Sequence, residues 1–230
     1  TVHEKWNKNI GILSGDVLLV KAYQQLARCK HENDLKEIFS KTAVQVCEGQ
    51  QYDMDFESKD NVSIKQYLEM IRLKTAVLLA ASLQMGAICA GAPHKSAKAF
   101  YKAGENLGMA FQLTDDYLDV FGAAEKTGKQ EGGDIISNKK TWLLIKAFEL
   151  ADKKQNKILK DWIGKELFIP KEKVNAIKNI FSELGLNYLL EKEIDVYYKK
   201  AFKDLRAACD NKEKIEMFIT FVKTLMRREN

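Results

Sequence analysis

The sequence predicts a single all-α domain, and three observations support that prediction. No stretch of the 230 residues alternates polar and apolar side chains in the way that a half-buried strand requires. Helix-breaking residues are rare, with 2 prolines in the whole chain. Apolar residues recur at spacings of three and four, and no linker, internal repeat or low-complexity tract divides the chain. We therefore expect one domain over residues 1–230, built as a helical bundle.

The N-terminal part predicts three helices after a lead-in over residues 1–8. Apolar spacing indicates helices over 9–27 and 35–52, with a polar break over 30–34 between them. A loop over 57–62 ends at Ser63, a residue type that caps helix N-termini. The helix that follows, over 64–90, is the most apolar of the chain, and Gly91-Ala92-Pro93 ends it. We expect this helix to be central.

The remaining chain predicts further helices. A helix over 96–121 carries Gly104 and Gly108, which would let a neighbouring backbone or a ligand approach closely. A loop over 122–137 precedes a helix over 141–159. Pro170 opens the next helix in its first turn, and Gly185 kinks or ends it. Helices over 186–208 and 212–227 complete the chain.

Composition excludes several classes of function. Apolar residues make up 46% and charged residues 30%, an ordinary globular composition. The net charge of +5 is small and no basic patch is interleaved with aromatic residues, so nucleic-acid binding has little support. The longest apolar stretch, over 76–91, is shorter than the roughly 20 residues of a membrane-spanning helix. The four widely spaced cysteines indicate reduced thiols. We therefore expect a cytoplasmic protein without a signal peptide or transmembrane segment.

An Asp-Asp-x-x-Asp motif lies within an apolar run. On a helix, Asp115 and Asp119 are one turn apart on one face, Asp116 lies beside them, and Gln112 lies one turn earlier. Carboxylates this close repel one another, and a hard divalent ion such as Mg²⁺ would offset the repulsion. Taken alone, the motif is explained equally well as a solvated acidic turn of a helix.

Glycines and lysines follow the acidic motif. They occur as Gly128-Lys129, Gly132-Gly133-Asp134 and Asn138-Lys139-Lys140. A metal-bridged polyphosphate site needs this combination, because carboxylates hold the metal, the metal holds the anion, and lysines neutralise the remaining oxygens.

Two other polar sets stand out. Lys74-Thr75 interrupts the most apolar helix, and its lysine either extends along the surface or projects into a polar cavity to meet an anion. Gln50 and Asp53 lie one turn apart at the end of a predicted helix, where a solvated helix end explains them as well. The three histidines fall near predicted breaks, and we assign none of them to a site.

The order of these motifs resembles the trans-type isoprenyl diphosphate synthases of the polyprenyl synthetase family, which includes farnesyl and geranylgeranyl diphosphate synthases. The resemblance covers most of the first 145 residues. The matching segments are Thr1-Val2-His3, Leu13-Ser-Gly-Asp16, Glu48-Gly49-Gln50-x-x-Asp53, Lys74-Thr75, Phe111-Gln112-x-x-Asp115-Asp116-x-x-Asp119, Gly128-Lys129-x-x-Gly132-x-Asp134 and Asn138-Lys139-x-Thr141.

The resemblance implies an all-α bundle around a central cavity, usually a homodimer, that uses Mg²⁺ or in its place Mn²⁺. An allylic diphosphate ionises there, isopentenyl diphosphate attacks the carbocation, and elimination gives a longer linear trans-prenyl diphosphate. The resemblance assigns metal binding to the second Asp-rich motif, formed by Asp115, Asp116 and Asp119, and binding of the allylic diphosphate to Lys74, Lys129 and Lys139. It places Thr75 and Gln112 beside the carbocation, with Gln112 also in contact with substrate, and Phe111 at the isopentenyl diphosphate site. Gln50 and Asp53 would be supporting residues. Lys74, Thr75 and Gln112 are thus the expected catalytic residues.

One part of the family pattern is absent. The first Asp-rich motif, the basic pair after it and a basic isopentenyl-binding segment precede, in the family, the stretch that matches Thr1-Val2-His3. We interpret this absence as truncation or disorder and expect the 230-residue chain alone to be nearly inactive.

Two alternative functions remain open. A non-catalytic prenyltransferase-like subunit that regulates another chain would have no need for mutually repelling carboxylates. A class I terpene cyclase would carry an Asn/Asp-Asp-x-x-Ser-x-x-x-Glu site, which residues 115–123 lack.

Overall fold

The structure, a computed structural model, describes residues 1–122 and 132–227. Over these residues it contains helices and no strand, which confirms the predicted all-α class. The elements are α1 (Val2–Lys5), α2 (Lys8–Leu26), α3 (Glu32–Ser58), α4 (Ile64–Ile71), the π-helix η1 (Arg72–Ala76), α5 (Val77–Cys89), α6 (His94–Phe121), α8 (Gly133–Ile136), α9 (Trp142–Leu150), α10 (Lys153–Ile163), α11 (Pro170–Glu183), α12 (Leu186–Ala208) and α13 (Lys212–Arg227).

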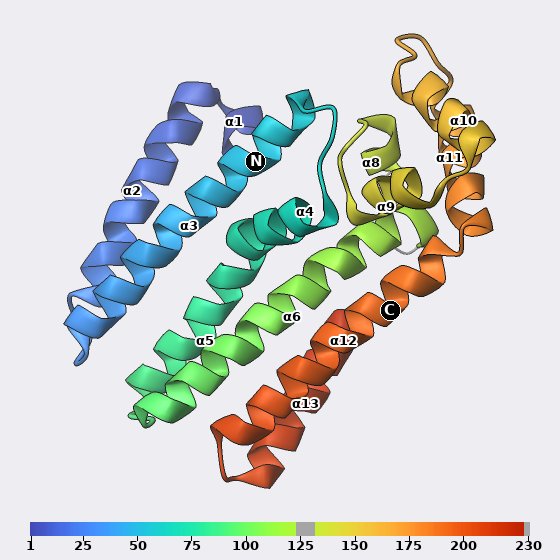
Figure 1. The fold of residues 1–230 in the computed structure, drawn as a ribbon. Helices are drawn as coiled ribbons and strands as arrows, with labels where there is room; N and C mark the ends of the chain where they lie inside the picture. The colour runs from blue at the N-terminus through green and yellow to red at the C-terminus, as the bar shows by residue number, and fades with distance from the viewer. Residues whose placement is uncertain (123–131, 228–230) are drawn as a thin grey trace.

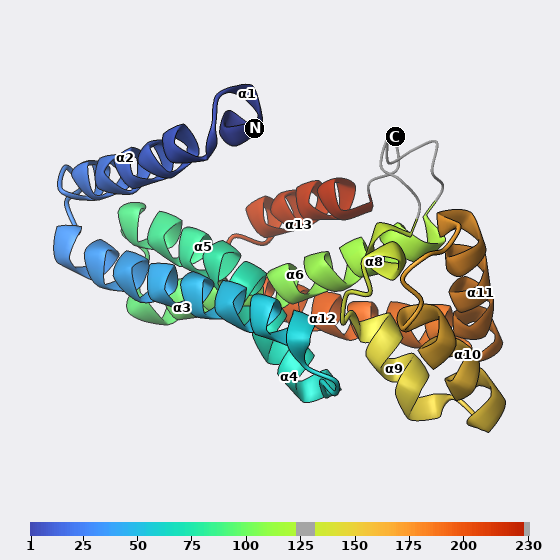
Figure 2. The same ribbon diagram turned by 90° about the horizontal axis from the view of Figure 1, so that it is seen from above.

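The long helices lie side by side (Figure 1). Their order is α2, α3, α4–α5, α6, α12, and each packs on the next, while α13 packs against α12. The shorter helices α8 to α11 gather at one end of this array, as Figure 2 also shows. The main apolar core lies at that end, between α4, α6, α9, α11 and α12, and includes the fully buried residues Tyr67, Leu113, Leu143, Phe181 and Leu190.

The predicted central helix forms as one continuous helical segment with a change of winding in the middle. Ser63 caps it in a capping box with Gln66. The π-helical turn Arg72–Ala76 then separates α4 from α5, and the turn at Gly91 has a positive φ of 75°. By length and composition alone Ile64–Cys89 is long and apolar enough to cross a membrane. Here it packs between α3 and α6 as a helix of the bundle.

Three glycines let α3 and α6 approach this segment closely. A Cβ atom placed on Gly49 of α3 would lie 2.3 Å from the backbone nitrogen of Lys74. On α6, a Cβ on Gly108 would lie 2.4 Å from Cα of Ala76, and one on Gly104 would lie 2.6 Å from Cα of Ala80. The close approach expected at Gly104 and Gly108 is confirmed, and the neighbour is the π-helical turn and the start of α5.

Several boundaries differ from the predictions. The expected helix over 141–159 is two helices, because Asp152 forms a capping box with Gln155 and starts α10. The expected loop over 122–137 contains α8, and the lead-in contains α1. The expected helix over 35–52 extends from Glu32 to Ser58, so Gln50 and Asp53 lie within α3 and not at its end. Pro170 and Gly185 act as predicted, the latter with a φ of 65°.

Candidate active site

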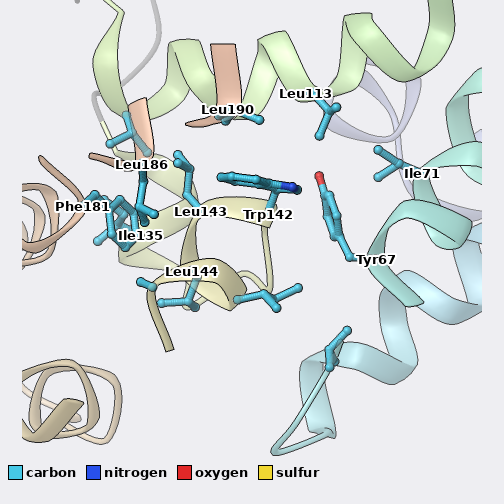
Figure 3. Packing of buried hydrophobic residues seen from close by; sticks show 14 of the residues in the cluster. Tyr67, Ile71, Leu113, Ile135, Trp142, Leu143, Leu144, Phe181, Leu186 and Leu190 are labelled. Atoms are coloured by element: carbon cyan, nitrogen blue, oxygen red, sulfur yellow. The ribbon is translucent and has the colours of Figure 1, made fainter. Parts of the chain in front are cut away.

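Asp116 is the buried member of the acidic motif on α6, with 2% of its surface exposed. Its carboxylate accepts hydrogen bonds from the hydroxyl of Tyr67 on α4 and, at 3.3 Å, from Nε2 of Gln112 one turn earlier. Figure 3 shows the Tyr67 side chain between Trp142 and Ile71, with its hydroxyl directed towards α6. Asp116 therefore points into the bundle, whereas Asp115 and Asp119 are partly exposed on the same helix.

Burial sets the protonation of this pair. It raises the pKa of Asp116 to about 7, although the hydrogen bonds from Tyr67 and Gln112 act in the opposite direction. Burial, with the nearby charge of Asp116, also raises the pKa of Tyr67 well above its usual value. Tyr67 was not identified from the sequence, since it lies 49 positions from Asp116 and no local pattern links them.

The π-helical turn directs two predicted site residues towards different neighbours. Nζ of Lys74 lies 2.6 Å from Oδ2 of Asp53 on α3. The hydroxyl of Thr75 donates to Oε1 of Gln112 on α6 at 3.1 Å. A π-helical turn of this kind is often found at functional sites. Together with the bond from Gln112 to Asp116, the bond from Thr75 completes a continuous chain of hydrogen bonds from Thr75 through Gln112 to Asp116.

Asp119 holds the backbone of the Gly132–Asp134 segment. Its Oδ2 accepts from the backbone N–H of Asp134 at 3.0 Å, and its carbonyl oxygen accepts from the N–H of Gly132 at 2.9 Å. Nζ of Lys139 then lies 3.6 Å from Oδ1 of Asp134. Through the Gly132–Asp134 segment, the acidic motif thus positions Lys139, the lysine that the family resemblance assigns to the diphosphate.

The carboxylates keep Lys139 charged. Burial lowers the pKa of this lysine, but the charges of Asp134, Asp116 and Asp53 outweigh that effect and the pKa is raised. Burial also raises the pKa of Asp134, while Lys139 lowers it and Asp119 raises it further. These mutual influences show that Asp53 of α3, Asp116 of α6, Asp134 and Lys139 share one electrostatic environment.

The predicted residues fall into three groups. Lys74, Thr75, Gln112, the Asp115–Asp119 motif and Lys139 are brought together as described above. Gln50 is exposed on α3, and Phe111 is partly buried next to Gln112. Lys129 lies outside the described residues.

A divalent ion fits this donor set as a partner of the substrate. No group of three His, Cys, Asp or Glu side chains in the described part of the chain is arranged to hold a metal ion by itself. With Asp116 directed inwards, Asp115 and Asp119 supply carboxylate oxygens on α6. Mg²⁺ in proteins usually takes one or two carboxylates and fills its remaining positions with phosphate oxygens and water.

A cavity of about 760 Å³ lies beside this site but is not part of it. It borders the segment after α6 at Asn138 and Lys140, and none of the acidic motif lines it. Its charged lining is balanced, with Lys59, Lys140 and Lys160 against Glu57, Asp60 and Glu149. It therefore has no charge preference for a diphosphate.

The family model described as Polyprenyl synthetase matches residues 1–184. The chain belongs to the polyprenyl synthetase family. The chain is 41% identical over 152 residues to a geranylgeranyl diphosphate synthase of Methanosarcina mazei, a match that covers 64% of this chain and 47% of that protein. It is 36% identical over 214 residues to the geranylgeranyl diphosphate synthase of Sulfolobus acidocaldarius, covering 89% of this chain and 63% of that protein. The chain thus spans about half to two thirds of the length of these relatives.

Solved structures agree with this membership. A crystal structure of a geranylgeranyl pyrophosphate synthase matches with a TM-score of 0.93 and 41% identity, over 100% of this chain and 72% of that one. A geranylgeranyl pyrophosphate synthase from Corynebacterium glutamicum, complexed with isoprenyl diphosphate and magnesium, matches with a TM-score of 0.82 and 27% identity, over 93% of this chain and 61% of that one.

Proposed function

We propose that the chain supplies a diphosphate- and metal-binding part of a trans-prenyltransferase site. In this reaction isopentenyl diphosphate condenses with an allylic diphosphate to give a longer linear prenyl diphosphate. The observation that carries the proposal is the hydrogen-bond chain from Thr75 through Gln112 to Asp116. Lys74, paired with Asp53, precedes Thr75 on the same turn, and Lys139 shares the electrostatic environment of Asp116 and Asp53. Family membership and the names of the relatives support it.

The lysines act on the leaving group. When the allylic C–O bond breaks, its electron pair leaves with the diphosphate, which gains negative charge. Lys74 and Lys139, each held by a carboxylate, can donate N–H groups to that growing charge. Because the charge is larger in the transition state than in the ground state, these interactions stabilise the transition state more. A bound Mg²⁺ would supply further positive charge to the diphosphate oxygens.

Thr75 and Gln112 act on the cation that remains. Their oxygens are dipoles fixed by the hydrogen bond between them and by the bond from Gln112 to Asp116. Dipoles held in place stabilise a carbocation without reorganising during the reaction. The double bond of isopentenyl diphosphate then attacks the cation, which forms the new C–C bond and leaves a cation on the former isopentenyl unit. Loss of a proton to the released diphosphate forms a new double bond and completes the product.

Three further assignments belong to the same proposal. Mg²⁺, or Mn²⁺ in its place, would be held by the Asp115–Asp119 motif through the carboxylates of Asp115 and Asp119. The structure of the Corynebacterium relative, which contains magnesium, supports the choice of metal. The protein is a homodimer, which the exposed apolar side chains of α2 support, including Ile12 (64% exposed) and Leu18 (66% exposed). It acts in the cytoplasm, in agreement with its four free cysteines.

The binding part of this proposal is tested with inorganic diphosphate and Mg²⁺ by isothermal titration calorimetry. We expect Asp115→Ala to abolish Mg²⁺-dependent binding, while helicity by circular dichroism stays the same or rises because repulsion within the motif is relieved. Asp161→Ala, at an exposed aspartate of α10, is the matched control. Unchanged binding by Asp115→Ala would remove Asp115 from the site.

A further inference from the structure

Lys173 on α11 is a buried cation that the proposed reaction does not use directly. It is 0% exposed. Its Nζ donates to Oδ1 of Asn138 at 2.6 Å and to the carbonyl oxygen of Ile136 at 3.1 Å, and it lies 4.2 Å from the centre of the Phe168 ring. Burial lowers its pKa. Burying an ammonium group is costly, and these partners offset only part of that cost.

Asn138 occupies an unusual backbone conformation. Its φ is 57°, and it is the one non-glycine residue with a positive φ in the described part of the chain. Both ends of its side-chain amide are engaged, since Oδ1 accepts from Lys173 and Nδ2 donates to the carbonyl oxygen of Ile163 at 3.1 Å. The left-handed turn is thus held from α11 on one side and from the end of α10 on the other.

Val174, the neighbour of Lys173 on α11, packs against Gly132, at the other end of the segment from Gly132 to Asn138. A Cβ on Gly132, whose φ is 71°, would lie 2.7 Å from a methyl group of Val174, the residue after Lys173. Directly after Asn138, the backbone N–H of Lys139 donates to the carbonyl oxygen of Asp134 at 2.9 Å. The position of Lys139 therefore depends on a turn whose conformation Lys173 fixes.

We propose that Lys173 is a positioning residue for diphosphate binding, which acts by holding the Asn138 turn so that the ammonium of Lys139 faces the anion. This inference rests on the proposed function, in which Lys139 binds the diphosphate. An apolar side chain would fill the same space without the cost of a buried charge, but it could not donate to both Ile136 and Asn138. The cation therefore specifies the turn.

The test is a double-mutant cycle on the affinity of the 230-residue chain for inorganic diphosphate in the presence of Mg²⁺. We expect Lys173→Met to weaken binding about tenfold, a change of about 1.4 kcal/mol. Lys139→Met weakens binding at least as much. In the double variant the second substitution adds nothing, because Lys173 acts only through Lys139.

Three variants separate positioning from general destabilisation. Lys173→Arg, which keeps the charge and the donors, restores part of the affinity. Lys171→Met, at an exposed lysine two residues earlier on α11, leaves it unchanged. If Lys173→Met does not fold, Asn138→Gly takes its place, since glycine permits the positive φ but removes the acceptor, and its affinity is expected to fall in the same way.

The outcomes distinguish this inference from the proposed function. Wild-type affinity in folded Lys173→Met or Asn138→Gly, or additive losses in the double variant, overturns the positioning role while leaving Lys139 in the site. Wild-type affinity in Lys139→Met instead overturns the assignment of Lys139, and the positioning role falls with it.

Discussion

Asp116 combines a buried carboxyl group with a pKa near neutrality. The unfolded chain would release its proton near the usual value of 3.8, whereas the native protein retains it up to about pH 7. Between these values the native state binds more protons than the unfolded state. The contribution of Asp116 to stability is therefore fully present below about pH 4 and is lost as the pH rises to about 7.

This linkage gives a prediction for the metal-free chain. Relative to Asp116→Asn, the free energy of unfolding of the wild type should fall as the pH rises from 4 to 7. The fall is at most about 4 kcal/mol, which corresponds to the shift in the pKa of Asp116 from 3.8 to about 7. Urea unfolding at several pH values measures it. If the difference in the free energy of unfolding between the wild type and Asp116→Asn does not change with pH, the raised pKa of the buried Asp116 carboxyl group is contradicted.

At the residue scale the sequence indicated candidate site residues but not the residues that hold them in place. The residues Asp115 to Asp119, Lys74 and Lys139 could be read from spacing and from the family resemblance. Tyr67 and Lys173 could not be predicted in this way. Tyr67 contacts Asp116, 49 positions away, and Lys173 contacts Asn138, 35 positions away, and no local sequence pattern links either pair.

At the element scale, the π-helical turn depends on two glycines that flank it. Gly49→Ala would place a Cβ 2.3 Å from the backbone of Lys74, and Gly108→Ala would place one 2.4 Å from Ala76. We expect each substitution to lower the free energy of unfolding by about 3 kcal/mol, since backbone cannot move aside as a side chain can.

Gly86→Ala is the matched control for these substitutions. Gly86 lies within α5, is exposed, and a Cβ there would meet nothing within 4 Å. We expect it to stabilise the chain by about 0.5 kcal/mol, through the helix propensity of alanine. Chemical denaturation followed by circular dichroism compares the three variants, and equal effects at all three positions would contradict the close approach.

Several helix boundaries were predictable because a capping serine, a proline or a glycine marks them. Ser63, Pro170 and Gly185 mark ends that the structure confirms. The break between α9 and α10 was missed because neither glycine nor proline occurs there, although Asp152 with Gln155 three residues later is a capping signal. The length of α3 was underestimated because its polar end, which includes Asp53, is stabilised by contact with Lys74 of η1.

At the scale of the whole molecule, α2 carries more exposed large apolar side chains than any other helix in the part of the chain that the structure describes. If a second copy covers it, Leu18→Lys should shift the sedimentation of the protein from dimer towards monomer, because a charge would be buried in the interface. Leu167→Lys, at a residue that is 88% exposed just before α11, should leave the association unchanged. A wild-type protein that is monomeric at all concentrations contradicts the homodimer.

We propose that the protein joins isopentenyl diphosphate to an allylic diphosphate. The most direct measurement uses protein from the complete reading frame, incubated with Mg²⁺, isopentenyl diphosphate and, separately, dimethylallyl, geranyl or farnesyl diphosphate, with products identified by mass spectrometry. We expect a linear prenyl diphosphate at least five carbons longer than the primer. Folded protein that gives no product from any primer would contradict it and favour a regulatory subunit, and a cyclic hydrocarbon would favour a terpene cyclase.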